Sequence, residues 1–454
     1  MKNLSIIVCY IIAAGVAKAQ GWHEVGTGNN ALHANHAINQ IAVDSLDFLY
    51  VGGSFRNANN EPYVARYNGA WDEPGTGTNA LHANSWITAV YTDQLGYPYA
   101  GGNFTNANGK RYVARWNNTS WSETGTGNAA LNADSTIWAL CSDDAENIYA
   151  GGDFKDASGY TYVAKWNGAT WSPLGTGANS LMGLSTILTL CSDPGGNIYA
   201  AGYLVDNNGV FYVEKWDGTT WTKLAPGFNG AVFSLCSDAA GNVYAGGDFK
   251  NPSGHRYIAK WSANSWSEVG TGPNAPNING TVITMTCNSA GNLYIGGNFT
   301  DAAQKQCIMK WNGNTWSELG SGNDALGANG AIYSVVARNG EVYTAGNFTN
   351  ANNEYYVAEF YDPTGVNSIE TGRNIRIYPN PAKSILHIDL SNVTGKYADI
   401  EIGDMTGHVL DKQTKAVSNS EACTTIALGG YASGVYFVNI KTPTSSASTT
   451  FIKD

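Results

Sequence analysis

The sequence is poor in charge. Only 13% of its 454 residues are Asp, Glu, Lys or Arg, about half of the usual quarter. The 36 acidic residues outnumber the 25 basic ones, so no basic stripe is available to hold the phosphates of a nucleic acid or of an anionic membrane. The apolar run at 4–17 is too short to span a bilayer, and no later segment approaches the roughly 18 consecutive apolar residues of a membrane-spanning helix. We therefore expect neither a nucleic-acid partner nor a transmembrane segment.

The sequence also lacks a recognisable catalytic motif. It contains no phosphate-binding glycine loop, no Cys-x-x-Cys, no Ser/His/Asp set and no carboxylate pair that can be named as a glycosidase pair. His33 and His36 have the spacing of metal ligands, but no Glu, Cys or third His lies nearby in the sequence. The loop at Asp238 has one carboxylate, which favours a turn over a calcium site. We expect no metal, no cofactor and no catalytic residue, which disfavours an enzyme without excluding one.

Glycine and aromatic residues are abundant instead, and they recur with a regular period. The chain has 54 Gly, 14 Trp and 26 Tyr. A Tyr-x-Gly-Gly segment, or a close variant, occurs seven times at intervals of 45 to 50 residues. The tyrosines of this segment are Tyr50, Tyr99, Tyr149, Tyr199, Tyr244, Tyr294 and Tyr343. A period near 50 with glycine punctuation is typical of propeller blades.

Each repeat contains four short segments with strand character. In the third repeat they are 137–141, 148–154, 162–166 and 170–174. The last two flank Asn167-Gly168, a pair that favours a two-residue hairpin because both residues accept positive φ. Four antiparallel strands make one blade. The sequence therefore predicts an all-β fold over residues 20–361, a seven-bladed β-propeller of four-stranded blades.

The two ends of the repeat region are offset by one strand. The fourth strand of each repeat begins near a Trp, and the first of these, Trp22, precedes any double glycine. After the third strand of the seventh repeat, at 356–360, no such fourth strand follows. We therefore predict that the N-terminal strand around Trp22 supplies the outer strand of the last blade. That arrangement closes the ring without leaving an open edge.

The repeat resembles that of kelch-type propellers, in which a double glycine ends one strand and a Tyr and a Trp follow. It is closer still to bacterial and fungal surface propellers with the repeat YxGGxF … VARWDG … W. The matching residues in the second repeat are Tyr99-Ala-Gly-Gly-Asn-Phe104, Val113-Ala-Arg-Trp116 and Trp121. The resemblance covers residues 20 to about 360. It implies a fold rather than an activity, because propellers serve many functions.

The N-terminus has the pattern of a signal peptide. Lys2 precedes an apolar run at 4–17, and Ala17-Lys18-Ala19 is a small-x-small cleavage site. We expect residues 1–19 to be removed, so that the mature chain starts at Gln20 and is exported.

Export permits disulfides, but the repeat argues against them. Cys141, Cys191 and Cys236 each stand in a Leu-Cys-Ser-Asp segment at the same place in their repeats. Equivalent positions in neighbouring blades are expected about 10 Å apart, whereas a disulfide needs Cα atoms within roughly 7 Å. We interpret these cysteines as small buried core residues.

A different composition follows the repeats. Residues 362–374 are interpreted as a linker, and 375–454 contain alternating segments that predict a small antiparallel β-sandwich. This segment resembles the type A sorting domain of the type IX secretion system. The residues that carry the resemblance are Tyr378, Pro379, Asn380, Pro381, Gly407, Gly434, Val435 and Tyr436.

The sorting-domain resemblance implies delivery rather than ligand binding. In that family the signal peptide leads to the periplasm, and the sorting domain engages the outer-membrane secretion machinery. The cargo is then anchored at the cell surface or released. We therefore expect residues 375–454 to bind that machinery and the propeller to reach the surface or the medium.

A charged residue precedes the aromatic residue of the third strand in every repeat. These residues are Arg66, Arg115, Lys165, Lys215, Lys260, Lys310 and Glu359. A charge that recurs within a repeat is normally structural. We expect Asp153 and Asp248, on neighbouring strands, to pair with the lysines of the third and fifth repeats.

Two tryptophans stand outside the repeat frame, Trp86 and Trp138. Aromatic residues occupy the Trp138 position in the fifth and seventh repeats, and three histidines lie in the loops that lead into inner strands. The candidate ligand-binding residues are therefore Trp86, Trp138, Phe233, Tyr333, His33, His36 and His82. Aromatic rings beside Asn-rich loops suit stacking on sugar rings. The alternative is that these rings plug the central channel.

Three functions remain open at this point. The first is a secreted or surface-anchored binding or adhesion module whose ligand is a glycan or a protein. The second is a polysaccharide-degrading enzyme on a propeller scaffold. The third is a structural component of the cell surface. The missing carboxylate pair and metal set favour the first and the third.

Overall fold

The computed structural model describes residues 21–45, 47–175, 181, 186–362, 376–378, 382–389, 397–404, 409–416, 423–442 and 445–453. Its contacts divide the chain into two compact units, Gly21–Ser368 and a second unit that contains Ile369–Asp454. The described residues form strands and five short 3-10 turns, with no α-helix among them. These turns are η1 (Gly28–Asn30), η2 (Gly77–Asn79), η3 (Gly127–Ala129), η5 (Gly272–Asn274) and η6 (Gly322–Asp324).

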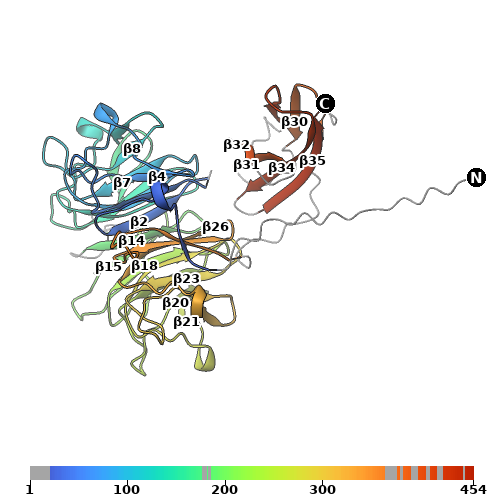
Figure 1. Cartoon of the computed structure of the whole chain (residues 1–454). Coiled ribbons are helices and arrows are strands. Elements are labelled where there is room, and N and C mark those ends of the chain that lie inside the picture. The colour runs from blue at the N-terminus through green and yellow to red at the C-terminus, as the bar shows by residue number, and fades with distance from the viewer. Residues whose placement is uncertain are drawn as a thin grey trace, which may run out of the picture. The chain divides into compact units, whose positions relative to one another are not determined.

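The first unit consists of seven four-stranded antiparallel sheets, which we number as blades in chain order (Figure 1). Blade 1 has β2 (Ile38–Val43), β3 (Leu49–Gly53), β4 (Ala65–Tyr67) and β5 (Trp71–Asp72); blade 2 has β6 (Ile87–Thr92), β7 (Pro98–Gly102), β8 (Ala114–Trp116) and β9 (Trp121–Glu123); blade 3 has β10 (Ile137–Ser142), β11 (Ile148–Gly152), β12 (Ala164–Trp166) and β13 (Trp171–Pro173). Blade 4 has β14 (Ile187–Ser192), β15 (Ile198–Gly202), β16 (Glu214–Trp216) and β17 (Trp221–Lys223); blade 5 has β18 (Val232–Ser237), β19 (Val243–Gly247), β20 (Ala259–Ser262) and β21 (Ser265–Glu268); blade 6 has β22 (Val282–Cys287), β23 (Leu293–Gly297), β24 (Met309–Trp311) and β25 (Trp316–Glu318).

Blade 7 combines the two ends of the unit. It contains β26 (Ile332–Arg338), β27 (Glu341–Gly346) and β28 (Ala358–Tyr361), and its outer strand is β1 (His23–Glu24). In the register of this pair, His23 lies opposite Glu359. The inner strand β26, orange in Figure 1, contacts the blue β2 of blade 1. The predicted closure of the ring by the N-terminal strand is therefore confirmed.

The double glycines allow close packing. A Cβ atom added to Gly52 would lie 2.6 Å from Cγ2 of Ile87 on the inner strand of the next blade. A Cβ added to Gly53 would lie 2.3 Å from the carbonyl oxygen of Ala37, just before the inner strand of its own blade. Real side chains do not fit at such distances, so only glycine lets the second strand approach both neighbours. The Phe two residues further on is fully buried in six blades.

Hydroxyl groups on the inner strands of blades 4 to 7 each bond to the next blade and so join five successive blades. Thr284 Oγ1 of blade 6 accepts a hydrogen bond from the backbone N–H of Val335 in blade 7, at 3.1 Å. Thr189 and Ser234 do the same toward blades 5 and 6. Ser334 Oγ accepts from the N–H of Ile41 at 3.0 Å and so joins blade 7 to blade 1. These bonds use backbone donors near the inner edges of the sheets.

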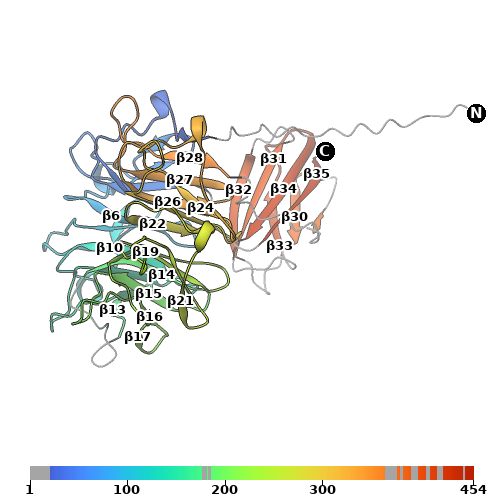
Figure 2. The same cartoon turned by 90° about the horizontal axis from the view of Figure 1, so that it is seen from below.

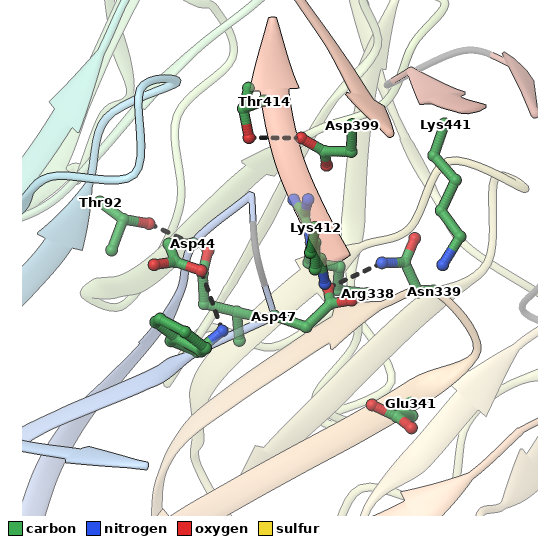
Figure 3. Close-up of polar contacts among 12 residues, drawn as sticks. Asp44, Asp47, Thr92, Arg338, Asn339, Glu341, Asp399, Lys412, Thr414 and Lys441 are labelled. Atoms are coloured by element: carbon green, nitrogen blue, oxygen red, sulfur yellow. Dashed lines mark hydrogen bonds and ion pairs between the residues drawn. The ribbon is translucent and has the colours of Figure 1, made fainter. Parts of the chain in front are cut away.

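Tryptophan side chains form a second belt on the outer strands. In every blade the fourth-strand Trp donates its indole N–H to a backbone carbonyl of the preceding blade. Trp22 donates to Leu319 at 2.7 Å and thereby joins β1 to blade 6. At the seam between blades 7 and 1, Asp47 also accepts from Asn339 at 2.7 Å and pairs with Arg338 (Figure 3). The ring is closed by polar contacts at several levels.

The repeat tyrosines are buried in the cores of the blades, and their hydroxyl groups contact carboxylates. In five blades the hydroxyl donates to an Asp six residues earlier, in the hairpin between the first and second strands. The basic residue of the third strand lies over the tyrosine ring, as Lys260 does at 5.6 Å from the Tyr244 centroid. The expected pairing of Lys260 with Asp248 is wrong, because Asp248 pairs with Arg256 at 2.6 Å.

The corresponding expectation for Lys165 and Asp153 is also wrong. Lys165 lies 5.6 Å from the centroid of the Tyr149 ring. Asp153 accepts hydrogen bonds from Trp138 and Thr186 instead. Lys165 lies on β12 as expected, but Asp153 lies one residue beyond the end of β11. The sequence therefore predicted only the position of the lysine correctly. It did not show that the tyrosine between them holds the lysine.

In this structure the described cysteines of the propeller are in the thiol form. Cys141, Cys191 and Cys307 are buried, and Cys236 and Cys287 are half-buried. The part of the chain that the structure describes contains no helix with the length and apolar composition needed to cross a membrane.

The second unit is a pair of sheets around one apolar core. One sheet has the order β29 (Arg376–Tyr378), β30 (Ile385–Asp389), β33 (Cys423–Ala427). The other has the order β32 (Val409–Ala416), β31 (Tyr397–Asp404), β34 (Gly434–Thr442), β35 (Ser445–Lys453), as Figure 2 shows. Leu386, Ile400 and Val438 lie in the shared core. The predicted small β-sandwich is confirmed.

Candidate functional site

The propeller has two faces that differ in their loops. The face where the inner strands begin carries the loops that lead into them and the loops that follow the double glycines. The opposite face carries the hairpins between first and second strands, where the tyrosine–carboxylate contacts lie. We call them the bulge face and the hairpin face. All seven candidate ligand-binding residues lie on the bulge face, either in its loops or at the second residue of an inner strand.

Every inner strand begins with a β-bulge at the same repeat position. The pairing with the second strand skips one residue in all seven blades. The skipped residues are Asn39, Thr88, Trp138, Leu188, Phe233, Ile283 and Tyr333. A bulge re-aims a side chain relative to the regular strand. We call these seven residues the bulge ring; three of the predicted aromatic residues belong to it.

The bulge ring is polar in two blades and apolar in five. Asn39 donates its side-chain N–H to the carbonyl of Ile87 at 2.8 Å, and Thr88 donates to the carbonyl of Ile137. Each of these two side chains therefore reaches the first residue of the next inner strand. The apolar members of blades 3 to 7 are all half-buried rather than buried. They leave part of their apolar surface accessible to solvent.

Trp138 is held in place by its indole N–H. The nitrogen donates to Asp153 Oδ2 at 2.8 Å, and the other oxygen of Asp153 accepts from Thr186 at 2.5 Å. The carboxylate fixes the edge of the ring and leaves its faces to packing and solvent. A positioned, half-exposed indole is the kind of surface on which a flat apolar ligand face can stack.

Phe233 has an aromatic neighbour that sequence reasoning missed. Its ring meets that of Tyr203 edge to face, with centroids 5.9 Å apart. Tyr203 follows the Ala-Gly that replaces the double glycine of blade 4, and its side chain is 45% exposed. Other blades have Ser, Asn or Asp at this position. The departure of blade 4 from the repeat was the signal that could have found it.

Trp86 lies one residue before the inner strand of blade 2 and is 46% exposed. The other blades have Ala or Thr at this position. Tyr160, in the loop after the double glycine of blade 3, is 47% exposed. Among the described propeller residues, Trp86, Tyr160 and Tyr203 are the exposed large aromatic side chains, and all three lie on the bulge face.

The three candidate histidines already form hydrogen bonds with other groups of the protein. His33 pairs with Glu354 at 2.9 Å and contacts the carbonyl of Gly28. His82 makes the same two contacts one blade later, with Glu61 at 3.1 Å and with the carbonyl of a glycine. Hydrogen bonding to the carboxylates raises the pKa of both imidazoles above the ordinary 6.5. His36 contacts the amide oxygen of its neighbour Asn35 at 3.2 Å.

Polar residues follow the double glycine in blades 2, 5 and 6, on the same face as the aromatic residues. Asp248 accepts two hydrogen bonds from the guanidinium of Arg256, at 2.9 and 2.6 Å. Asn103 accepts from Arg111 at 3.1 Å and from Thr136 at 3.2 Å. Asn298 occupies the corresponding position of blade 6 and is exposed. No group of three or more His, Cys, Asp or Glu side chains able to hold a metal occurs in the part of the chain that the structure describes.

The sorting-signal residues are only partly within the described structure. Tyr378 ends β29, and Gly434, Val435 and Tyr436 begin β34. Tyr436 is buried, donates to the carbonyl of Ala432 at 2.7 Å and stacks on Phe451. The remaining predicted residues lie outside the described residues: Pro379, Asn380, Pro381 and Gly407.

Comparison with protein families identifies the second unit. Residues 376–454 match the model of the secretion system C-terminal sorting domain. This segment is a sorting domain. The match confirms the predicted sorting domain and indicates export of the chain to the cell surface or the extracellular space, through the secretion machinery that reads the domain. No curated protein matches the chain.

Solved structures are similar to the chain in fold. A fungal alcohol oxidase of the AA5 family in complex with copper is 14% identical, with 95% of this chain and 98% of that chain covered and a TM-score of 0.51. YCF48 bound to a peptide is 10% identical over 76% of this chain and 98% of its own, with a TM-score of 0.49. A PL25 ulvan lyase bound to -[GlcA(1-4)Rha3S]- is 14% identical over 76% and 95%, with a TM-score of 0.44. At such identities these likenesses concern the fold alone.

Proposed function

We propose that the chain is an exported binding module whose kelch-like propeller holds a glycan on its bulge face at the cell surface or outside the cell. The observation that carries the proposal is the apolar part of the bulge ring, with Trp138 and Phe233 half-buried and Tyr203 beside Phe233. Isolated exposed apolar residues are ordinary on protein surfaces. A bulge that recurs in seven blades and presents apolar side chains in five of them is a built feature.

A sugar ring offers one apolar face and a rim of hydroxyl groups, and the bulge face offers both complements. Aromatic rings supply flat apolar surface at a low entropic cost, because they have only two side-chain torsions. On the protein, the residues that follow the double glycines contribute amide and carboxylate groups, such as Asn298, Asp248 and Asn103. Small-ligand sites usually combine aromatic side chains with a few directed polar groups.

The candidate residues are unequal in this proposal. Trp86, Trp138, Phe233, Tyr333 and Tyr203 are the contact residues. His33 and His82 position the loops, because both imidazole nitrogens already contact groups of the protein. The signal peptide at 1–19 and the recognition of residues 375–454 by the outer-membrane machinery belong to the same proposal, since a surface module must be delivered.

A glycan-array screen of the full secreted chain tests the proposal. We expect binding to at least one glycan, and we expect Trp86→Ala or Tyr203→Ala to weaken it by about 10- to 30-fold, the effect of losing one aromatic contact of about 2 kcal/mol. The matched control is Leu95→Ala. Leu95 is a similarly exposed apolar residue in blade 2, but it lies in a hairpin of the opposite face.

Three outcomes separate the alternatives. Binding that falls in the bulge-face variants and persists in Leu95→Ala supports the module. Absence of binding to every glycan, or equal loss in all variants, contradicts the glycan site and favours protein adhesion or a structural coat. Shortening of a bound polysaccharide during incubation, followed by chain-length analysis, would make the propeller an enzyme instead.

A further inference from the structure

The cysteines of the inner strands do not all occupy the same place in the repeat. Cys141, Cys191 and Cys236 each lie opposite the repeat tyrosine of their own blade. In blade 6 that place is held by Thr286, and Cys287 is the next residue, opposite Leu293. Successive side chains of a strand point to opposite faces. Cys287 therefore points to the opposite face of its sheet from the one to which Cys141, Cys191 and Cys236 point in their own sheets.

The contacts between blades show which faces meet. In blade 2 the residue opposite the repeat tyrosine is Tyr91, and its hydroxyl lies 2.8 Å from Ser142 Oγ in blade 3. Ser142 is the last residue of its inner strand, one position after the place opposite the tyrosine. The tyrosine-opposed position of one blade thus meets the following position of the next blade. Between blades 5 and 6 the same rule brings Cys236 to Cys287.

The two sulfur atoms are in contact. Cys236 Sγ lies 2.7 Å from Cys287 Sγ, although the residues are 51 positions apart in the chain. The equivalent partners at the two preceding interfaces are serines, Ser192 and Ser237, so Cys141 and Cys191 meet no cysteine by this rule. We propose that Cys236 and Cys287 form a disulfide that links the inner strands of blades 5 and 6 in the exported protein.

The chemistry is a thiol–disulfide exchange with a dithiol oxidase of the export compartment. One cysteine thiolate attacks the disulfide of the oxidase and forms a mixed disulfide, and the second cysteine then displaces the oxidase. The two thiols of the chain lose two protons and two electrons, and the disulfide of the oxidase becomes two thiols. An exported protein passes through such a compartment, and the sorting domain indicates export.

The surroundings of the pair determine when the bond can form. Burial raises the pKa of the Cys236 thiol well above its usual range, so the thiolate needed for exchange is scarce once the blades have closed. The exchange therefore takes place during folding, before blades 5 and 6 pack together. The same burial then shields the finished bond from reductants.

Peptide mapping of the secreted, full-length protein tests the proposal. The protein is denatured without reductant, free thiols are alkylated, and trypsin is added. Cleavage after Lys223, Lys250, Lys260 and Lys305 places the two cysteines on separate peptides, 224–250 and 261–305. We expect these peptides to be linked and lighter by two hydrogen atoms than the free pair. Alkylated, unlinked Cys236 and Cys287 overturn the proposal, and so does a link from either one to Cys191.

A stability measurement gives an independent readout. A disulfide stabilises a fold mainly by restricting the unfolded chain, so reductant should lower the melting temperature of the wild-type protein by several degrees. Cys236→Ser and Cys287→Ser should melt lower than wild type and should not respond to reductant. Cys191→Ser is the matched control and should keep the response. Equal melting of wild type with and without reductant, under conditions that reduce the denatured protein, contradicts the bond.

Discussion

The hairpin face of the propeller repeats a side-chain contact, whereas the bulge face repeats a backbone conformation. On the hairpin face the same side chains make the same contact in successive blades, a tyrosine hydroxyl on a carboxylate with a basic residue over the ring. On the bulge face the same backbone bulge recurs, but its side chain changes from Asn to Thr, Trp, Leu, Phe, Ile and Tyr. The tyrosine–carboxylate contact lies within a single blade and keeps the same residue types in five blades. The bulge position keeps its backbone geometry while its side chain varies.

Blades 6 and 7 show how strongly the hairpin-face contact is maintained. Blade 6 has Asn288 where the carboxylate is expected, and Asp362, which follows the last propeller strand, supplies the missing charge. Asp362 accepts from Tyr294 at 2.6 Å and pairs with Lys310, and all three residues are buried. In blade 7 the hydroxyl of Tyr343 donates to Glu341 instead. Different residues at different sequence positions restore one contact.

The largest expected effect is therefore on the hairpin face. Asp362→Asn removes the charge that compensates buried Lys310 and should lower the free energy of unfolding by about 3–5 kcal/mol, the usual cost of breaking a buried ion pair. The matched control on the bulge face is Asp248→Asn, which breaks the half-exposed pair with Arg256 and should cost less than about 1 kcal/mol. Denaturant unfolding of both variants measures the difference. Equal losses would show that the two faces do not differ in structural role.

The fold was largely predictable because glycine, tyrosine and tryptophan recur at fixed positions of the repeat. The double glycine at Gly52 and Gly53 marks close approach of strands, and Trp22 before the first repeat marks the closing strand. The glycines are needed where strands approach closely, and the regular spacing of the repeat is visible in the sequence itself.

The details of the sites were less predictable, because they depend on which blade each side chain meets. The carboxylate partner of Tyr294 comes from Asp362, outside the repeat frame. Tyr203 was visible as a departure of blade 4, yet its contact with Phe233 of blade 5 needs the arrangement of the blades. Cys287 required both the frame shift and the rule for neighbouring faces. The prediction that the cysteines are too far apart considered equivalent positions only.

A second test compares stability and binding at one bulge. Phe233→Leu places on blade 5 the type of side chain that blade 4 already has at the same position. Because the side chain is half-exposed, we expect the free energy of unfolding to change by less than about 1.5 kcal/mol. Glycan binding should fall, since the flat ring and its contact with Tyr203 are lost. A large loss of stability, measured by denaturant unfolding, would mean that the bulge ring is a structural plug.

The smallest expected effect concerns a contact that recurs on the bulge face, the pairing of His33 with Glu354. Hydrogen bonding to Glu354 raises the pKa of His33 above 6.5 in the folded chain, so the folded state binds the proton more tightly than the unfolded state. The stabilisation is complete below about pH 6.5 and is lost as the pH rises through the folded-state pKa. Because the pair is exposed, added salt should reduce it.

Titration of the imidazole signals by NMR measures this contact directly. The midpoint of His33 should lie above 6.5 in the native protein and should fall toward 6.5 in Glu354→Gln. His82 pairs with Glu61 in the same geometry and is the internal control, because its midpoint should stay raised in that variant. If both midpoints moved together, the shift would come from the net charge of the protein rather than from a pair. If only the midpoint of His33 moved, the shift would come from its own pair with Glu354. That pair is exposed and is therefore weaker than the buried Asp362 pair of the hairpin face.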